Sequence, residues 1–170
     1  TNLPVYTHLH GYSATSGYGI PSGSDNIGYA LSLRDNVVTG AEFAHTWWYG
    51  VSNNYEIHPF QKGDTIVDYT AMRYIHYLHA MKNDSRFSID TNRVYLTGTS
   101  MGGGGTLLIG CHYPGLFAAF APVIGRMNYP EKSFDHRWGS VSLGLTARNG
   151  IQIYKWNNVG WILENMRHIE

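Results

Sequence analysis

A serine with a glycine two positions away on each side is the feature of this sequence best suited to chemistry. The segment Gly98-Thr99-Ser100-Met101-Gly102 fits the pattern G-x-S-x-G, in which the serine hydroxyl is the nucleophile of acyl-transfer enzymes. A serine raised on a sharp turn brings the backbone close to its neighbours, so the flanking positions must lack large side chains. The motif predicts that Ser100 attacks a carbonyl carbon and forms an acyl-enzyme.

The residues around Ser100 predict the elements that such a turn would join. The run 94–97 is rich in β-branched and aromatic residues and predicts a strand, and residues 106–113 predict a helix. Five-residue patterns with three fixed positions also recur by chance in ordinary Gly-Ser turns, but the order strand, serine, helix favours the nucleophile turn. The N–H of Met101 would then lie at the helix N-terminus, without a helical partner, as half of an oxyanion hole.

The sequence around this motif resembles a known group of enzymes. The run IDTNRVYLTGTSMGGGGTLLIGCHYPGLFAAFAPVIG, residues 89–125, is similar to the central part of α/β-hydrolase esterases related to polyhydroxyalkanoate depolymerases, feruloyl esterases and the esterase-D group. The likeness is strong over residues 64–125, weaker upstream, and fades beyond Gly125. It implies a carboxylic ester hydrolase with Ser100 as the nucleophile, residues 117–125 as the next strand, and no cofactor.

The segment His10-Gly11-Tyr12 follows a predicted strand over residues 3–9. In the hydrolase family an HG pair after an early strand supplies the second oxyanion donor, so the resemblance implies the N–H of Tyr12 or of Gly11. Two alternatives remain for the histidines. His8 and His10 could bind zinc from one face of a strand, or they could be one core and one loop histidine. No carboxylate close in sequence and no later histidine pair with ligand spacing accompanies them, so we predict no metal.

Three aromatic residues stand together in Thr46-Trp47-Trp48-Tyr49-Gly50. Consecutive side chains cannot all share one face, so at least one should be exposed unless it lines a groove. We interpret Trp47, Trp48 and Tyr49 as a candidate substrate-binding wall. Ordinary core and rim packing is the alternative.

The chain alternates between strand and helix patterns, which predicts the α/β class. Residues 64–83 predict a helix with Asp64 as its N-cap, on which His76 and His79 occupy flank positions. Residues 116–124 are apolar on both faces, as in an inner strand of a parallel sheet. Together with the earlier strands these elements predict a mostly parallel, doubly wound sheet, the α/β-hydrolase core. Less regular segments predict a helical turn near residues 29–33, a strand within 37–45 and a helix within 157–167.

The partners that a serine nucleophile needs are poorly represented after Ser100. A histidine base and an orienting carboxylate are required, and in α/β-hydrolases they follow the serine on loops after later strands. Asp135, His136 and His168 are weak candidates, because the first two are adjacent and the third is expected at a helix end. We therefore predict a single α/β-hydrolase domain over residues 1–170 that is incomplete. Early strands and the last strands would be missing, and a complementing chain or segment would supply the acid and the histidine.

Composition limits the partners and the location of the protein. The 170 residues are 43% hydrophobic, enough for one domain with a sizeable core. Twelve acidic and twelve basic side chains cancel, so we expect no nucleic-acid partner, and no apolar run is long enough to cross a membrane. The single cysteine, Cys111, excludes an internal disulfide and is expected to pack. The aromatic fraction of 14% and the 20 glycines are typical of secreted or extracellular enzymes that act on polymers or sugars.

The predicted function is hydrolysis of small-molecule or polymeric esters. Two alternatives share the scaffold. One is a non-catalytic module whose aromatic side chains bind carbohydrate or polymer, and the other is a serine peptidase or acyltransferase with a different leaving group or acceptor.

Overall fold

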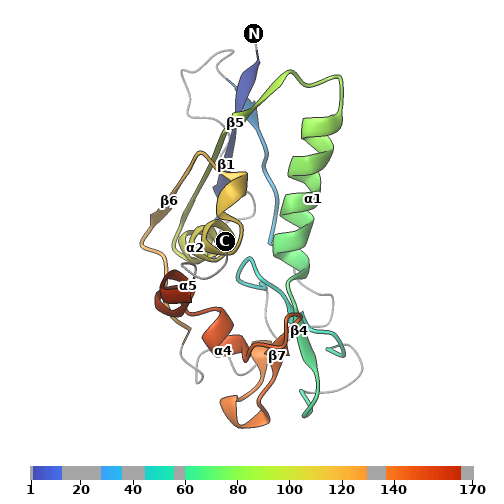
Figure 1. Ribbon diagram of the computed structural model, residues 1–170, viewed down its shortest axis with the longest axis vertical. Coiled ribbons are helices and arrows are strands. Elements are labelled where there is room, and N and C mark those ends of the chain that lie inside the picture. Colours follow the sequence, from blue (N-terminus) through green and yellow to red (C-terminus); the bar gives the residue numbers. More distant parts are fainter. Residues whose placement is uncertain (1, 13–27, 36–44, 56–59, 130–136, 166–170) are drawn as a thin grey trace.

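The computed structural model describes residues 2–12, 28–35, 45–55, 60–129 and 137–165. Two short 3-10 helices lie at Pro114–Leu116 and Val141–Leu143. The strands and α-helices labelled in Figure 1 or used below are β1 (Leu3–Leu9), β2 (Tyr29–Ala30), β3 (Val51–Ser52), β4 (Thr65–Val67), α1 (Tyr69–Asn83), β5 (Ile89–Thr99), α2 (Met101–His112), β6 (Ala119–Val123), β7 (Thr146–Ala147), α4 (Ile153–Trp156) and α5 (Val159–Asn165). None of these described helices is long and apolar enough to cross a membrane.

The main sheet has four parallel strands in the order β2-β1-β5-β6. Leu9 of β1 pairs with Gly98 of β5, and Thr99 of β5 pairs with Val123 of β6. The carboxyl ends of three strands therefore meet at one edge, which is where ligands bind in open α/β sheets. A second, three-stranded sheet, β3-β4-β7, lies beyond the N-terminal end of α1 (Figure 1).

One hydrophobic core joins the main sheet to α1 and α2. Alternate residues of the strands point into it, as the period of two requires. Its most buried strand and helix residues, all at most 1% exposed, are Val5, Leu9, Val94 and Leu96 of the strands with Tyr74, Leu78, Met101 and Ile109 of the helices. The intervening residues Tyr6 and Tyr95 lie on the other face of the sheet, where their rings stack 5.3 Å apart. The mostly parallel sheet with its flanking helices confirms the predicted α/β class.

Several predicted boundaries were wrong because pairing partners lie far away in sequence. The helix predicted for residues 64–83 divides into β4 and α1, and Asp68, not Asp64, is the N-cap. Strand β4 forms because residues 65–67 pair with β3 and β7. Similarly, the helical turn predicted near residues 29–33 is β2, which pairs with β1.

Strand β6 also differs from its prediction as an inner strand. Among the described residues it pairs with β5 alone, at the edge of the sheet. Phe120 turns toward α2, where its ring fits against Gly110, while the alternate Val123 is 48% exposed. The strand within the apolar run 116–124 thus has one face packed against α2 and one face exposed to solvent. The strand predicted within residues 37–45 lies almost wholly outside the described residues.

The other helix predictions agree better with the structure. Helix α5 lies within the range 157–167 predicted to be helical, whose last two residues are outside the described part. His76 and His79 are exposed on α1, as expected for flank positions. Cys111 is buried and unpaired by any disulfide.

His112, the last residue of α2, is held against α4. Its ring stacks on Trp156, with centroids 4.3 Å apart and planes 7° apart, and its Nε2 lies 3.1 Å from Trp156 O. A carbonyl oxygen only accepts, so Nε2 carries the proton and donates. Burial, which disfavours the charged form, lowers the pKa of His112 to about 4.

This buried imidazole predicts a stability that depends on pH. The unfolded chain binds the proton near pH 6.5, whereas the folded protein binds it near pH 4, so the stabilisation is complete above pH 6.5 and is lost as the pH falls toward 4. The free energy of unfolding should drop by about 3 kcal/mol across this window, as measured by urea denaturation. His112→Gln should flatten the dependence, and exposed His79→Gln should leave it unchanged. If the free energy of unfolding changed equally with pH in His112→Gln and in the parent protein, His112 would not be the group responsible.

Candidate active site

Ser100 lies on a strained turn between the end of β5 and the start of α2. Its backbone angles are φ 57° and ψ −115°, in a region that non-glycine residues rarely adopt. The Ser100 N–H donates to Val123 O at 2.9 Å, and its carbonyl accepts from Gly104 N at 3.0 Å. The residue is exposed. The predicted order of strand, serine and helix, and the predicted sharp turn, are confirmed.

Gly98 and Gly102 allow the turn to close. A Cβ on Gly98 would lie 2.3 Å from Gly102 O, and one on Gly102 would lie 1.9 Å from Leu9 O. Both obstacles are backbone carbonyls, which cannot swing aside as a side chain can. The spacing of the motif therefore follows from the close approach of α2 to β5 and β1.

Backbone amides lie on both sides of Ser100. Gly11 follows β1, and a Cβ placed on it would be 3.7 Å from Ser100 Cβ. Met101 is the first residue of α2, so its N–H has no acceptor within the helix. Tyr12 follows Gly11 with its side chain 51% exposed. The structure places Gly11 and Met101 beside the serine, with Tyr12 following Gly11, and the catalytic role of these three residues remains a prediction.

A buried carboxylate holds the segments behind this turn. Asp35 is 1% exposed; its Oδ1 accepts from Thr46 N at 3.0 Å and Thr46 Oγ1 at 2.5 Å, and its Oδ2 accepts from Trp48 N at 3.0 Å. The Asp35 N–H donates to His10 Nε2 at 3.0 Å, and His10 Nδ1 donates to Gly11 O at 2.8 Å. Both nitrogens of His10 are thus engaged, which leaves neither for zinc or for a proton from serine. Sequence reasoning missed Asp35, because it stands in a polar connection without any pattern.

Removing this carboxylate should cost substantial stability. Asp35→Ala would leave the N–H groups of Thr46 and Trp48 buried without an acceptor, at roughly 1–3 kcal/mol for each group. We expect the free energy of unfolding, measured by urea denaturation, to fall by about 3 kcal/mol or more. Asp84→Ala is the control, because Asp84 pairs at the surface with Arg86, which is 82% exposed, and such exposed pairs add little to stability. Equal losses in the two variants would refute the supporting role of Asp35.

The three consecutive aromatic residues point to different places. Trp48 is fully buried, donates from Nε1 to His10 O at 3.1 Å, and packs against Gly105 of α2. The prediction that it contacts substrate is therefore wrong. Trp47 is half-buried, with the Arg126 guanidinium 5.7 Å from its ring centroid. Tyr49 is 3% exposed and lines a separate pocket.

The described part of the chain shows no histidine partner for the Ser100 hydroxyl. No described histidine forms a hydrogen bond with Ser100 Oγ. Asp135, His136 and His168, the candidates from the sequence, lie outside the described residues. A metal-binding group of three or more His, Cys, Asp or Glu side chains is likewise absent from the described part of the chain, and the alternative zinc pair His8 and His10 gains no third ligand there.

Comparisons with known proteins show the fold. No protein-family model matches the sequence, and no curated protein matches it significantly. Among solved structures, FphF of Staphylococcus aureus, a fluorophosphonate-binding serine hydrolase with bound substrate, has a TM-score of 0.56 at 14% identity. That alignment covers 99% of this chain and 61% of FphF. A thermostable esterase has a TM-score of 0.49 at 16% identity, with 96% of this chain and 44% of the esterase covered. The chain has an α/β-hydrolase core and spans about three fifths of the length of FphF.

Proposed function

We propose that this chain carries the nucleophile of a serine hydrolase that cleaves carboxylic esters. The observation that supports this most strongly is an exposed serine held at φ 57° between β5 and α2, with the amides of Met101 and Gly11 beside it. Ser100 Oγ would attack the ester carbonyl and release the alcohol, which takes up a proton. Water would then cleave the acyl-enzyme, release the acid and restore the hydroxyl.

The amides beside Ser100 would stabilise the tetrahedral intermediate. Negative charge develops on the carbonyl oxygen, and N–H groups fixed before the reaction stabilise it without reorganisation. Met101 would supply one donor and Gly11 or Tyr12 the other. Both positions are fixed by the backbone of β1 and α2, so the donors do not depend on side-chain rotamers.

The base and the acid are proposed to come from a complementing chain or segment. A histidine must accept the proton of Ser100 Oγ and pass it to the leaving alcohol. No histidine that the structure describes forms a hydrogen bond with that oxygen. Within the chain, Asp135, His136 and His168 remain the candidates.

The proposed substrates are small-molecule or polymeric esters. Trp47 is the remaining candidate contact, because it is the partly exposed member of the aromatic run. The sequence likeness to polyhydroxyalkanoate depolymerases, feruloyl esterases and the esterase-D group supports an ester over an amide. A peptidase or acyltransferase would use the same serine with a different leaving group or acceptor.

A fluorophosphonate probe tests this proposal directly. The product of the complete open reading frame that encodes this chain is incubated with the probe, and the labelled residue is located by peptide mass spectrometry. We expect one adduct, on Ser100, in folded protein and none after unfolding in urea. FphF serves as the positive control. A folded protein that stays unlabelled while FphF is labelled would exclude the proposed nucleophile.

A further inference from the structure

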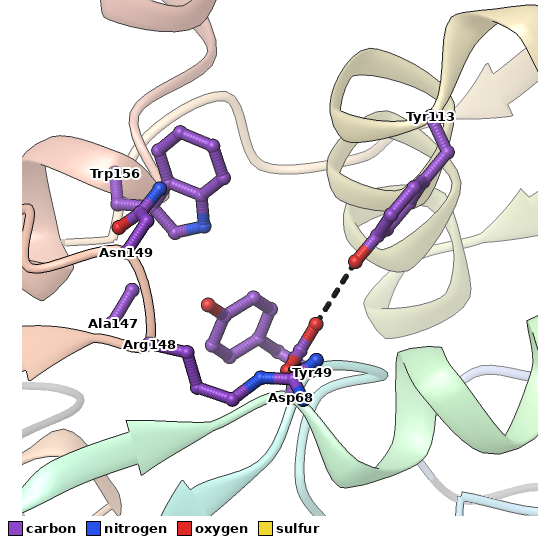
Figure 2. Close-up of a pocket in the computed structure, with 7 residues that line it drawn as sticks. All are labelled: Tyr49, Asp68, Tyr113, Ala147, Arg148, Asn149 and Trp156. Carbon is purple, nitrogen blue, oxygen red and sulfur yellow. Dashed lines mark hydrogen bonds and ion pairs between the residues drawn. The ribbon is translucent and has the colours of Figure 1, made fainter.

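A pocket lies at the opposite end of α2 from Ser100. Its volume is about 320 Å³, at the lower end of the roughly 300–1,000 Å³ of small-molecule sites. Ser100 precedes the first residue of α2, whereas Tyr113, in the pocket, follows the last. A helix of 12 residues is roughly 18 Å long, so the two sites are separate. The polar and aromatic residues that line the pocket are Tyr49, Asp68, Tyr113, Arg148, Asn149 and Trp156 (Figure 2).

The pocket contains a buried carboxylate with unused acceptor capacity. Asp68, at the N-cap of α1, is 7% exposed. Its Oδ2 accepts from Tyr113 OH at 2.9 Å. Its Oδ1 is buried and forms an ion pair with Arg148 Nη2 at 2.7 Å. Because a carboxylate oxygen can accept two hydrogen bonds, Oδ2 keeps one free acceptor position beside a guanidinium whose side chain is 51% exposed.

The charges in the pocket favour a neutral ligand. The charges of Asp68 and Arg148 cancel. A cationic ligand would be repelled by Arg148, and an anionic ligand would be repelled by Asp68. The two phenols add no charge, because burial and the nearby Asp68 raise the pKa of both Tyr49 and Tyr113. What remains is an acceptor at Asp68 next to donors on Arg148 and Asn149. Adjacent hydroxyl groups, each able to donate and accept, match this arrangement.

Aromatic rings form the sides of the same pocket. Figure 2 shows Trp156 and Tyr113 on opposite sides, with the ring of Tyr49 between them. Stacking on His112 fixes the ring of Trp156. Rigid rings supply apolar contact area for the C–H faces of a ligand that also carries hydroxyl groups.

We propose that this pocket binds a neutral sugar residue, as a non-catalytic site separate from Ser100. The ring of the sugar packs against Trp156 or Tyr113, and adjacent hydroxyls bridge the Asp68 and Arg148 side chains. The site does not depend on the reaction proposed for Ser100. It would hold the protein on a glycan whether or not the serine is catalytic.

Titration with methyl β-D-glucopyranoside and methyl β-D-xylopyranoside tests the site, followed by ¹H–¹⁵N spectra of the protein. We expect at least one of the two sugars to shift the indole N–H signal of Trp156 and the side-chain amide of Asn149. Arg148→Ala alters a side chain that is 51% exposed and removes the proposed donor to the sugar hydroxyls. It should weaken the measured Kd at least about tenfold. Arg86→Ala, which removes an exposed arginine from another Asp–Arg pair, should leave the Kd unchanged.

Three results would overturn the sugar site. One is the absence of shifts in the pocket for both sugars at their highest soluble concentrations. Another is a stronger response to choline or to glucuronate than to the neutral glycosides. The third is loss of sugar binding in Ser100→Ala, which would place the sugar at the proposed active site. These experiments measure sugar binding, whereas the fluorophosphonate experiment measures labelling of Ser100. A negative result for the sugar site would therefore leave the proposed nucleophile untouched.

Discussion

Replacing Ser100 with alanine is expected to lower kcat/KM for ester hydrolysis by about four orders of magnitude or more. The variant keeps the amide donors but loses the oxygen that forms the acyl-enzyme. Its fold should persist, because the side chain is exposed and the turn is held by backbone hydrogen bonds to Val123 and Gly104. The measurement is the rate of p-nitrophenyl butyrate hydrolysis, together with loss of fluorophosphonate labelling.

Ser142→Ala provides the matched control, because Ser142 is an exposed serine that pairs only with neighbouring Ser140. It should retain parental hydrolysis and labelling. If Ser100→Ala kept its activity, catalysis would belong to another group, and the turn at Ser100 would have a structural role only. If both variants lost activity with an intact fold, the assay would not report on Ser100.

The nucleophile turn could be predicted from the sequence because its causes are local. A β-branched run before Ser100 and the glycines at 98 and 102 specify strand, turn and helix within a few residues. The position of Gly11 beside Ser100 depended on the resemblance to a family, since register between β1 and β5 is a long-range property. The helix itself begins at Met101, earlier than its periodic pattern, because glycines weaken that pattern while close packing against β1 requires them.

The remaining features depend on contacts between distant segments. Strands β2 and β4 are only two and three residues long, and they exist because β1, β3 and β7 pair with them. In the sequence Asp35 looks like any aspartate in a loop, because its role depends on hydrogen bonds from Thr46 and Trp48 that form only in the folded chain. For residues 47–49, the sequence showed that the three side chains must point in different directions, but not which one would be buried. That choice follows from the packing of Trp48 against Gly105.

The second large effect is expected at Gly102, where even one methyl group should disrupt the fold. In Gly102→Ala the new Cβ would lie 1.9 Å from Leu9 O and 2.7 Å from His10 O. Relief requires α2 to move away from β1, which opens the core around Leu9 and Met101. We expect the free energy of unfolding to fall by more than roughly 4 kcal/mol, a value that single substitutions reach only through severe disruption of this kind. In thermal unfolding this corresponds to a Tm lower by roughly 10 °C or more, and folded yield should fall with it.

Gly115→Ala separates this steric effect from the general cost of changing a glycine. A Cβ at Gly115 has no heavy atom within 4 Å, so its stability should stay within about 0.5 kcal/mol of the parent. The displaced helix in Gly102→Ala would also carry the Met101 amide away from Ser100, so labelling by the fluorophosphonate should fall even in the fraction that remains folded. A Gly102→Ala protein with parental Tm would show that α2 does not approach β1 this closely. The geometry proposed for the oxyanion donors would then lose its support, since it depends on that same contact.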